Sequence, residues 1–240
     1  MSDRPVLALH HISRSFGSVP VLQDISLEVA PGEVVVIVGP SGCGKTTLLN
    51  ILSGHDAPSS GEVSQSGILR RVYQSDGLFP WLTVTENIKL GLRDIPAADR
   101  EREFAELIAL IRLEGFESYY PHQLSGGMRQ RVELARALAG EADALLMDEP
   151  FSALDYQTRL RLRRELAHLL LRKPRATVLV THDLEEAAQL ADRILVLSAR
   201  PAHIQCELRP ELPRPRDLTH PVVVDTIRQL LDILGLEAGD

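Results

Sequence analysis

The chain has 240 residues, 44% of them hydrophobic, two cysteines and a formal net charge of -7 at pH 7. This length suits one large domain or a domain with a subdomain, and the acidic balance argues against a nucleic-acid partner, which usually requires a basic stripe. The cysteine spacing fits neither a metal site nor a disulfide framework, which favours a reducing cytoplasm. We find no secretory signal and no apolar run long enough to span a membrane, so we expect membrane association only through a partner protein.

Residues 6–29 predict a pair of antiparallel strands with a turn at residues 16–18. Apolar positions recur with the period of two that half-buried strands show, at Leu7, Leu9 and His11, and at Ile25, Leu27 and Val29. Phe16, at the turn, has two open interpretations. It is either a core aromatic or a ring on which an adenine stacks.

The apolar run of residues 34–38 leads into a glycine loop and a second apolar run at residues 48–52. The loop fits the phosphate-binding pattern G-x-x-x-x-G-K-[ST] between a strand and a helix. Its glycines allow backbone N–H groups to turn inward around a phosphate, at the positive end of a helix. Lys45 would reach the β- and γ-phosphates, and Thr46 would offer its hydroxyl to Mg²⁺. The loop comprises Gly39, Pro40, Ser41, Gly42, Cys43, Gly44, Lys45, Thr46 and Thr47.

The loop after residue 74 is unusually apolar. Phe79, Trp81 and Leu82 stand beside glycine and proline, and a short turn cannot bury all three. This pattern predicts an exposed patch that meets another protein, with packing against the next helix as the alternative. Gln74 ends the preceding strand-like run and is a candidate ligand for Mg²⁺ or for an attacking water.

Two helices are predicted next, over residues 99–113 and from residue 124 onward. The second opens with Leu124-Ser125-Gly126-Gly127-Met128, where a hydroxyl, flexible N–H groups and a helix dipole together form an anion site. One triphosphate already has a cradle at residues 39–47. The second cradle, made of Ser125, Gly126 and Gly127, therefore suggests the nucleotide of another subunit.

Strands and helices then alternate, as expected for a parallel sheet covered on both faces. We predict strands at residues 144–147, 177–180 and 193–197, and helices at residues 156–172, 184–190 and 222–234. The arginine-rich segment at residues 159–164 is interpreted as a solvated helix face.

Asp148 and Glu149 follow the strand at residues 144–147, and His182 follows the strand at residues 177–180. Ligands of open α/β sheets bind at this edge. Asp148 is a candidate to hold Mg²⁺ through its water shell, and Glu149 to deprotonate a water that attacks the γ-phosphate. His182 is a candidate polarising residue beside that phosphate.

Together these motifs resemble the nucleotide-binding subunit of an ABC (ATP-binding cassette) transporter over nearly the whole chain. Residues 39–47 match the Walker A loop, residues 124–128 the LSGGQ signature, residues 144–148 Walker B and residues 152–155 the D-loop. Gln74 matches the Q-loop, Glu149 the catalytic glutamate and His182 the H-loop, and Phe16 takes the adenine-stacking position. Two departures are Met128, in place of the signature glutamine, and Phe16, usually tyrosine. The resemblance implies that two subunits pack head to tail around two ATPs.

The same resemblance implies an α/β fold with a P-loop ATPase core, a mixed and mostly parallel sheet, an antiparallel β subdomain and a helical subdomain. It implies one ABC ATPase domain over residues 1–240. Residues 1–73 and 144–220 would form the RecA-like core with the β subdomain, residues 75–143 the helical subdomain, and residues 221–240 a C-terminal helix.

Residues 79–88, 147–155 and 212–217 resemble the ATPases of nitrate, sulfonate and taurine importers. This implies an enzyme that uses ATP and Mg²⁺ to energise uptake of a small anionic solute. It would act as a homodimer beneath two permease subunits at the cytoplasmic face of the bacterial inner membrane, with an extracytoplasmic solute-binding protein. The alternatives are another transporter class or a non-transport ABC ATPase. A P-loop kinase would leave residues 124–128 unexplained.

Overall fold

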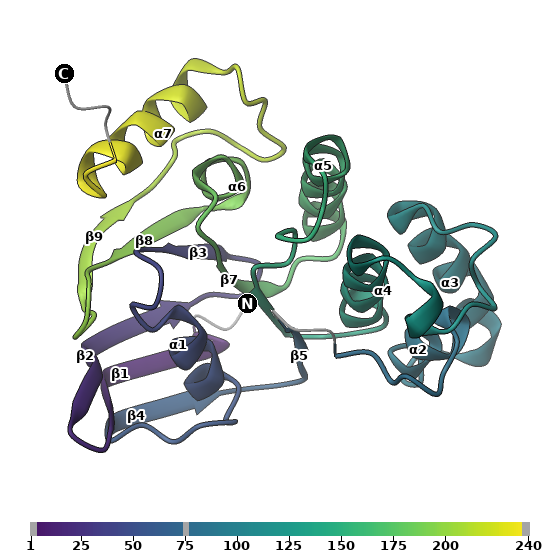
Figure 1. The fold of residues 1–240 in the computed structure, drawn as a ribbon, viewed down its shortest axis with the longest axis horizontal. Coiled ribbons are helices and arrows are strands. Elements are labelled where there is room, and N and C mark those ends of the chain that lie inside the picture. Colours follow the sequence, from purple (N-terminus) through teal and green to yellow (C-terminus); the bar gives the residue numbers. More distant parts are fainter. Residues whose placement is uncertain (1–3, 74–76, 237–240) are drawn as a thin grey trace.

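The computed structural model describes residues 4–73 and 77–236 (Figure 1). Its centre is a six-stranded sheet in the order β5-β6-β7-β3-β8-β9, parallel except for the antiparallel pair of β8 and β9. Side chains of β3 alternate between two hydrophobic clusters, Val36 entering one and Ile37 the other, because successive residues of a strand face opposite sides of the sheet. The strands are β3 (Val34–Val38), β5 (Leu69–Val72), β6 (Ala144–Asp148), β7 (Ala176–Val180), β8 (Arg193–Leu197) and β9 (Ile204–Leu208).

A second, antiparallel sheet has the order β2-β1-β4, with β1 at Leu7–Phe16, β2 at Val19–Val29 and β4 at Ser60–Gln65. The predicted alternation fails at His11, which is exposed, while Ile12 is fully buried. His11 has a φ of 53°, and the pairing of β1 with β2 shifts register between Leu9 and Ile12. A bulge of this kind inserts one residue and reverses the faces beyond it.

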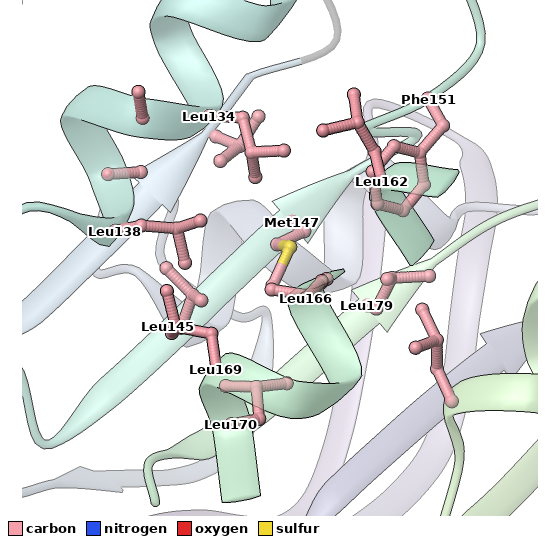
Figure 2. Close-up of a cluster of buried hydrophobic side chains, with 14 of the residues drawn as sticks. Leu134, Leu138, Leu145, Met147, Phe151, Leu162, Leu166, Leu169, Leu170 and Leu179 are labelled. Carbon is pink, nitrogen blue, oxygen red and sulfur yellow. The ribbon is translucent and has the colours of Figure 1, made fainter. Parts of the chain in front are cut away.

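Helix α1 (Lys45–Leu52) contacts strands of both sheets, so the loop before it lies at the junction of the two sheets (Figure 1). On the other side of the central sheet lie α4 (Gly126–Leu138), α5 (Tyr156–Arg172) and α6 (Leu184–Leu190). Helix α7 (Pro221–Ile233) packs on α6. Figure 2 shows the core between these layers, where Leu134 of α4, Met147 of β6 and Leu166 of α5 point toward one another.

Helices α2 (Val84–Leu90), α3 (Ala97–Ile111) and η1 (Pro121–Gln123) form a group with α4 at one end of the molecule (Figure 1). The last turn of α3 is joined to the neighbouring helices by arginines. Arg131 of α4 donates to the Ile111 carbonyl at 2.7 Å, and Arg161 of α5 donates to the Leu110 carbonyl at 3.3 Å. Helix ends leave such carbonyls without intrahelical partners, and cations are favoured there.

Helix α2 and strand β9 were not predicted from the sequence. Helix α2 has seven residues, too few for a clear apolar period, but its capping box of Thr83 and Glu86 was a readable signal. Strand β9 lies in a proline-rich stretch and has only partly buried apolar residues, so its pairing with β8 comes from tertiary contacts.

Candidate functional site

The phosphate loop connects β3 to α1. Gly44 precedes the helix with a φ of 124°, and a Cβ at this position would lie 2.8 Å from Leu22 Cδ2, so only glycine fits. Lys45 is 7% exposed, and its Nζ donates to the carbonyls of Gly39 at 2.7 Å and Pro40 at 3.0 Å. An ammonium group has three donors. Two of them stabilise the loop, and the third has only a weak acceptor, Cys43 Sγ, at 4.0 Å.

These residues border a cavity of about 350 Å³ at the edge of the sheet. Its wall includes both halves of the glycine loop and one residue from each of two distant segments. The lining residues are Ser41, Gly42, Gly44, Lys45, Thr46, Thr47, Glu149 and Arg200. Arg200 was not predicted as a site residue, because no local sequence pattern links the β8–β9 turn to the loop.

Thr46 and Asp148 meet beside this cavity, as their positions at the sheet edge predict. The Thr46 hydroxyl donates to Asp148 Oδ1 at 3.3 Å. Asp148 Oδ2 is buried without a hydrogen bond, 3.6 Å from Arg71 Nη2. Burial raises the pKa of Asp148, opposed by the Thr46 hydrogen bond and the Arg71 charge. A hydroxyl and an unsatisfied carboxylate oxygen are the donors that Mg²⁺ prefers. These two residues therefore fit a magnesium ion.

Glu149 and His182 come from the ends of neighbouring strands β6 and β7. Glu149 Oε1 and His182 Nδ1 share a hydrogen bond of 3.1 Å. The Glu149 backbone is in the left-handed region, with a φ of 48°, and its N–H donates to the Val180 carbonyl at 3.0 Å. A positive φ is uncommon for a non-glycine residue, and such strain is often found at functional sites. The conformation places the Glu149 carboxylate at the wall of the phosphate cavity.

Gln130 of α4 supports this turn and was not predicted as a site residue. Its side chain donates to the Glu149 carbonyl at 2.9 Å and accepts from the Ala153 N–H at 2.9 Å. Gln130 is 8% exposed, so both bonds are shielded from water. The segment that holds Glu149 is thus fixed to the helix that begins at Gly126.

The second glycine cradle begins α4. Ser125 caps this helix by accepting the Met128 N–H at 3.3 Å, and Ser125 and Gly126 are exposed. A Cβ at Gly127 would lie 3.0 Å from the Ala153 carbonyl oxygen. None of these residues borders the cavity of the phosphate loop. The structure does not bring the two cradles together within one chain.

Gln74, the remaining candidate of this group, lies outside the described residues. The residues on either side of its segment are both held by α4. Glu133, which is 1% exposed, accepts from the Tyr73 N–H at 2.9 Å and from the Gly77 N–H at 3.1 Å.

Phe16 is 47% exposed, which rules out the core-aromatic interpretation, and the Arg14 guanidinium lies 4.5 Å from its ring centroid.

The arginine-rich segment was predicted as a solvated helix face, and this prediction is wrong for Arg163. Its side chain is fully buried. It pairs with Asp183 and lies 3.6 Å from Glu185, and Arg159 also binds Asp183 at 2.9 Å. Only Arg164 of the segment is exposed. The prediction failed because the sequence does not reveal which acidic side chains α6 places against the arginines of α5.

This buried network continues to the residue before His182. The Thr181 hydroxyl donates to Glu186 Oε2 at 2.7 Å and accepts the Asp183 N–H at 3.0 Å. Burial raises the pKa of Glu186 to about 7, opposed by the Arg163 charge and the Thr181 hydrogen bond. Glu186 therefore holds its proton in the folded protein at pH values where it is ionised in the unfolded chain.

We expect the stability difference between Glu186→Gln and the wild type to depend on pH. The folded pKa of Glu186 is raised from 4.5 to about 7, so its favourable contribution is complete below pH 4.5 and is lost as the pH rises through about 7. Glutamine mimics the protonated form. The free energy of unfolding of Glu186→Gln, relative to that of the wild type, should therefore rise by about 2 kcal/mol between pH 5 and pH 8, as measured by urea denaturation. If Glu186→Gln is instead less stable relative to the wild type at pH 8 than at pH 5, ionised Glu186 stabilises the fold through Arg163.

Residues 22–152 match the sequence model of the ABC transporter family. The chain belongs to the ABC transporter family. The aliphatic sulfonates import ATP-binding protein SsuB 2 of Burkholderia lata is 42% identical over 236 residues, which cover 95% of this chain and 86% of the relative. SsuB of Bacillus licheniformis is 45% identical over 217 residues, which cover 87% of this chain and 84% of the relative.

The solved structures support the same assignment. The dimeric, post-hydrolysis structure of the ATP-binding cassette MJ0796 with ADP and Pi has a TM-score of 0.75 at 31% identity, covering 85% of this chain and 98% of that one. The predicted fold class, with its mixed sheet, antiparallel sheet and helices, is confirmed. The protein is an ABC-type ATPase. Among the residues that the structure describes, no helix of this cassette has the length and apolar character to cross a membrane.

Proposed function

We propose that this ATPase is the energising subunit of an importer for a small anionic solute of the nitrate, sulfonate or taurine type. The proposed ATPase mechanism rests on one observation. The phosphate loop of residues 39–47 and the second glycine cradle at residues 125–127 do not share a cavity within one chain. Each cavity then needs Ser125, Gly126 and Gly127 of a second copy. The importer part rests on the sulfonate-import names of the relatives.

In this proposal the loop of residues 39–47 binds the phosphates, and Phe16 stacks on the adenine. Thr46, Asp148 and Gln74 would hold Mg²⁺, and the ion would supply positive charge to neutralise the β- and γ-phosphates. Glu149 acts as general base toward the attacking water. His182, hydrogen-bonded to Glu149 at 3.1 Å, keeps that carboxylate oriented.

The proposed assembly is a homodimer beneath two permease subunits at the cytoplasmic face of the bacterial inner membrane. A solute-binding protein on the other side delivers the anion. Within each copy, residues 75–143 form the helical subdomain, and residues 1–73 and 144–220 form the core with its β subdomain. The hydrogen bonds of Glu133 to Tyr73 and Gly77 connect the signature helix to the segment that contains Gln74, which supports coupling between nucleotide and permease.

The proposed permease contact is the apolar loop before α2. Phe79 is 41% exposed and Trp81 is 68% exposed, with ring centroids 5.5 Å apart. Asn87 is fully buried, and its amide bonds the backbone of Phe79, Leu82 and Thr83. The loop is therefore held in place from inside while both rings remain at the surface, as in a preformed interface.

Replacing Phe79 and Trp81 with serine should release the ATPase from its permease. Aromatic anchors dominate interface energies, so recovery of the ATPase with the tagged permease should fall by about tenfold or more. Basal ATPase activity should persist, because neither ring lines the phosphate cavity. Val224→Ser, at an exposed apolar position on α7, is the matched control. A double variant that fails to fold would support a packing role instead.

The test of the whole proposal is the complex in lipid vesicles, reconstituted with its permease and solute-binding protein. We expect aliphatic sulfonates, taurine or nitrate to stimulate ATP hydrolysis and to accumulate inside the vesicles. ATP hydrolysis without stimulation by any of these anions would retain the ATPase assignment and reject the solute class.

A further inference from the structure

Arg200 is a second cation at the phosphate loop, beside Lys45. It lies in the turn between β8 and β9 and borders the cavity that contains Lys45 and Glu149. It also borders an adjoining hollow lined by Pro40, Ser41, Gly42, Cys43 and Ala199. A Cβ at Gly42 would lie 3.8 Å from Arg200 Nη2. The guanidinium thus lies directly against the glycine loop.

The Arg200 side chain is exposed and forms no hydrogen bond or ion pair within residues 4–73 and 77–236. Nearby arginines behave differently. Arg193 of β8 pairs with Glu33 and Glu207, and Arg209 pairs with Glu207. Arg193 and Arg209 therefore form ion pairs within the chain, whereas the guanidinium of Arg200 lies beside the phosphate loop with its N–H donors available.

The backbone around Arg200 is fixed. Ala202 is fully buried, donates to the Val21 carbonyl at 2.8 Å and accepts the Gln23 N–H at 2.8 Å. Across the turn, the His203 N–H donates to the Ser198 hydroxyl at 3.1 Å. These bonds tie the turn to β2, whose Val21 and Leu22 also pack beside Gly44 of the phosphate loop. The backbone position of Arg200 relative to the loop is therefore set before any ligand binds.

We propose that the Arg200 guanidinium binds the terminal phosphate of the nucleotide held at the phosphate loop. This inference rests on the nucleotide site proposed above. The phosphate under attack has to lie next to Glu149, and Arg200 shares that cavity with Glu149. A planar guanidinium offers paired donors that match phosphate oxygens. Lys45 and Arg200 then contact a triphosphate from two sides.

The test measures binding of ATP and of ADP to the full chain, each with Mg²⁺, at protein concentrations below dimer formation. Arg200→Ala should weaken ATP binding by about tenfold, as expected for loss of a charge-assisted hydrogen bond, and ADP binding by less than about threefold. Arg200→Lys should recover part of the ATP affinity, because it keeps the charge without the fork. Arg228→Ala removes an exposed arginine of α7 and serves as the control.

Several results would overturn the inference. Unchanged ATP affinity in Arg200→Ala would do so, including the case in which only dimer assembly changes, since Arg200 would then serve the partner copy. Equal losses for ATP and ADP would remove the preference for the terminal phosphate. The proposed nucleotide site is tested separately, because its failure would appear as absent ATP binding in the wild type, or as unaltered binding in Lys45→Ala.

Discussion

Glu149→Gln should abolish ATP turnover while leaving ATP binding intact. A positioned general base contributes about 10²–10⁴-fold to rate, so kcat should fall by at least about a hundredfold. Glutamine has nearly the same shape but cannot accept the proton of the attacking water. The neighbouring backbone bonds of residue 149, to Val180 and to Gln130, do not involve the carboxylate and should persist.

The variant should also accumulate as a dimer in the presence of ATP, because the composite site closes but cannot hydrolyse its nucleotide. Phosphate release measures the turnover, and size-exclusion chromatography with and without ATP measures the dimer. Glu62→Gln, an exposed glutamate on β4, is the matched control and should match the wild type. A monomeric and fully active Glu149→Gln would reject both the catalytic role and the composite site.

Arg163→Met should destabilise the protein by about 3–5 kcal/mol, the cost of removing one partner from a buried ion pair. The guanidinium is fully buried against Asp183 and Glu185. Removing it leaves Asp183 with Arg159 as its remaining ion-pair partner among the described residues. Urea denaturation measures the free energy of unfolding.

The adjacent arginine supplies the control. Arg164→Met changes the same residue type one position away, where the side chain is exposed, and should cost less than about 0.5 kcal/mol. Combining Arg163→Met with Asp183→Asn should recover part of the loss, because the amide keeps the cap of α6 and carries no charge for Arg163 to balance. Equal effects of the two arginine variants would show that Arg163 is not part of a stabilising network.

The larger part of the fold was predictable because its signals are local. The valine and isoleucine run of β3, the glycine loop after it and the helical period of α5 each occupy consecutive residues. Each is decided by sterics, backbone freedom or side-chain periodicity over one or two turns. Where local signals are short or shared with other structures, prediction failed, as at α2, at β9 and at the bulge near His11.

Side-chain burial was less predictable than element type. The arginines of residues 159–164 look alike in the sequence, but a helix face is buried or solvated according to what packs on it. The neighbour here is α6, which brings Asp183 and Glu185. The exposure of Phe79 and Trp81, in contrast, followed from the sequence, because a short turn cannot bury three large apolar side chains, whereas Leu82, the third residue of the predicted patch, is half-buried.

The sequence by itself determined the residue types of the candidate site and their order: the phosphate loop, the second glycine cradle, the Asp148-Glu149 pair and His182. Only the tertiary structure decided which of them meet. The order β6-β7-β3-β8 brings Thr46 to Asp148, Glu149 to His182 and Arg200 to Gly42, while Ser125 stays away from the phosphate cavity. Strand order depends on the burial of both faces of the sheet rather than on which residues are neighbours in the chain. Contacts between distant segments therefore cannot be predicted from a local sequence pattern.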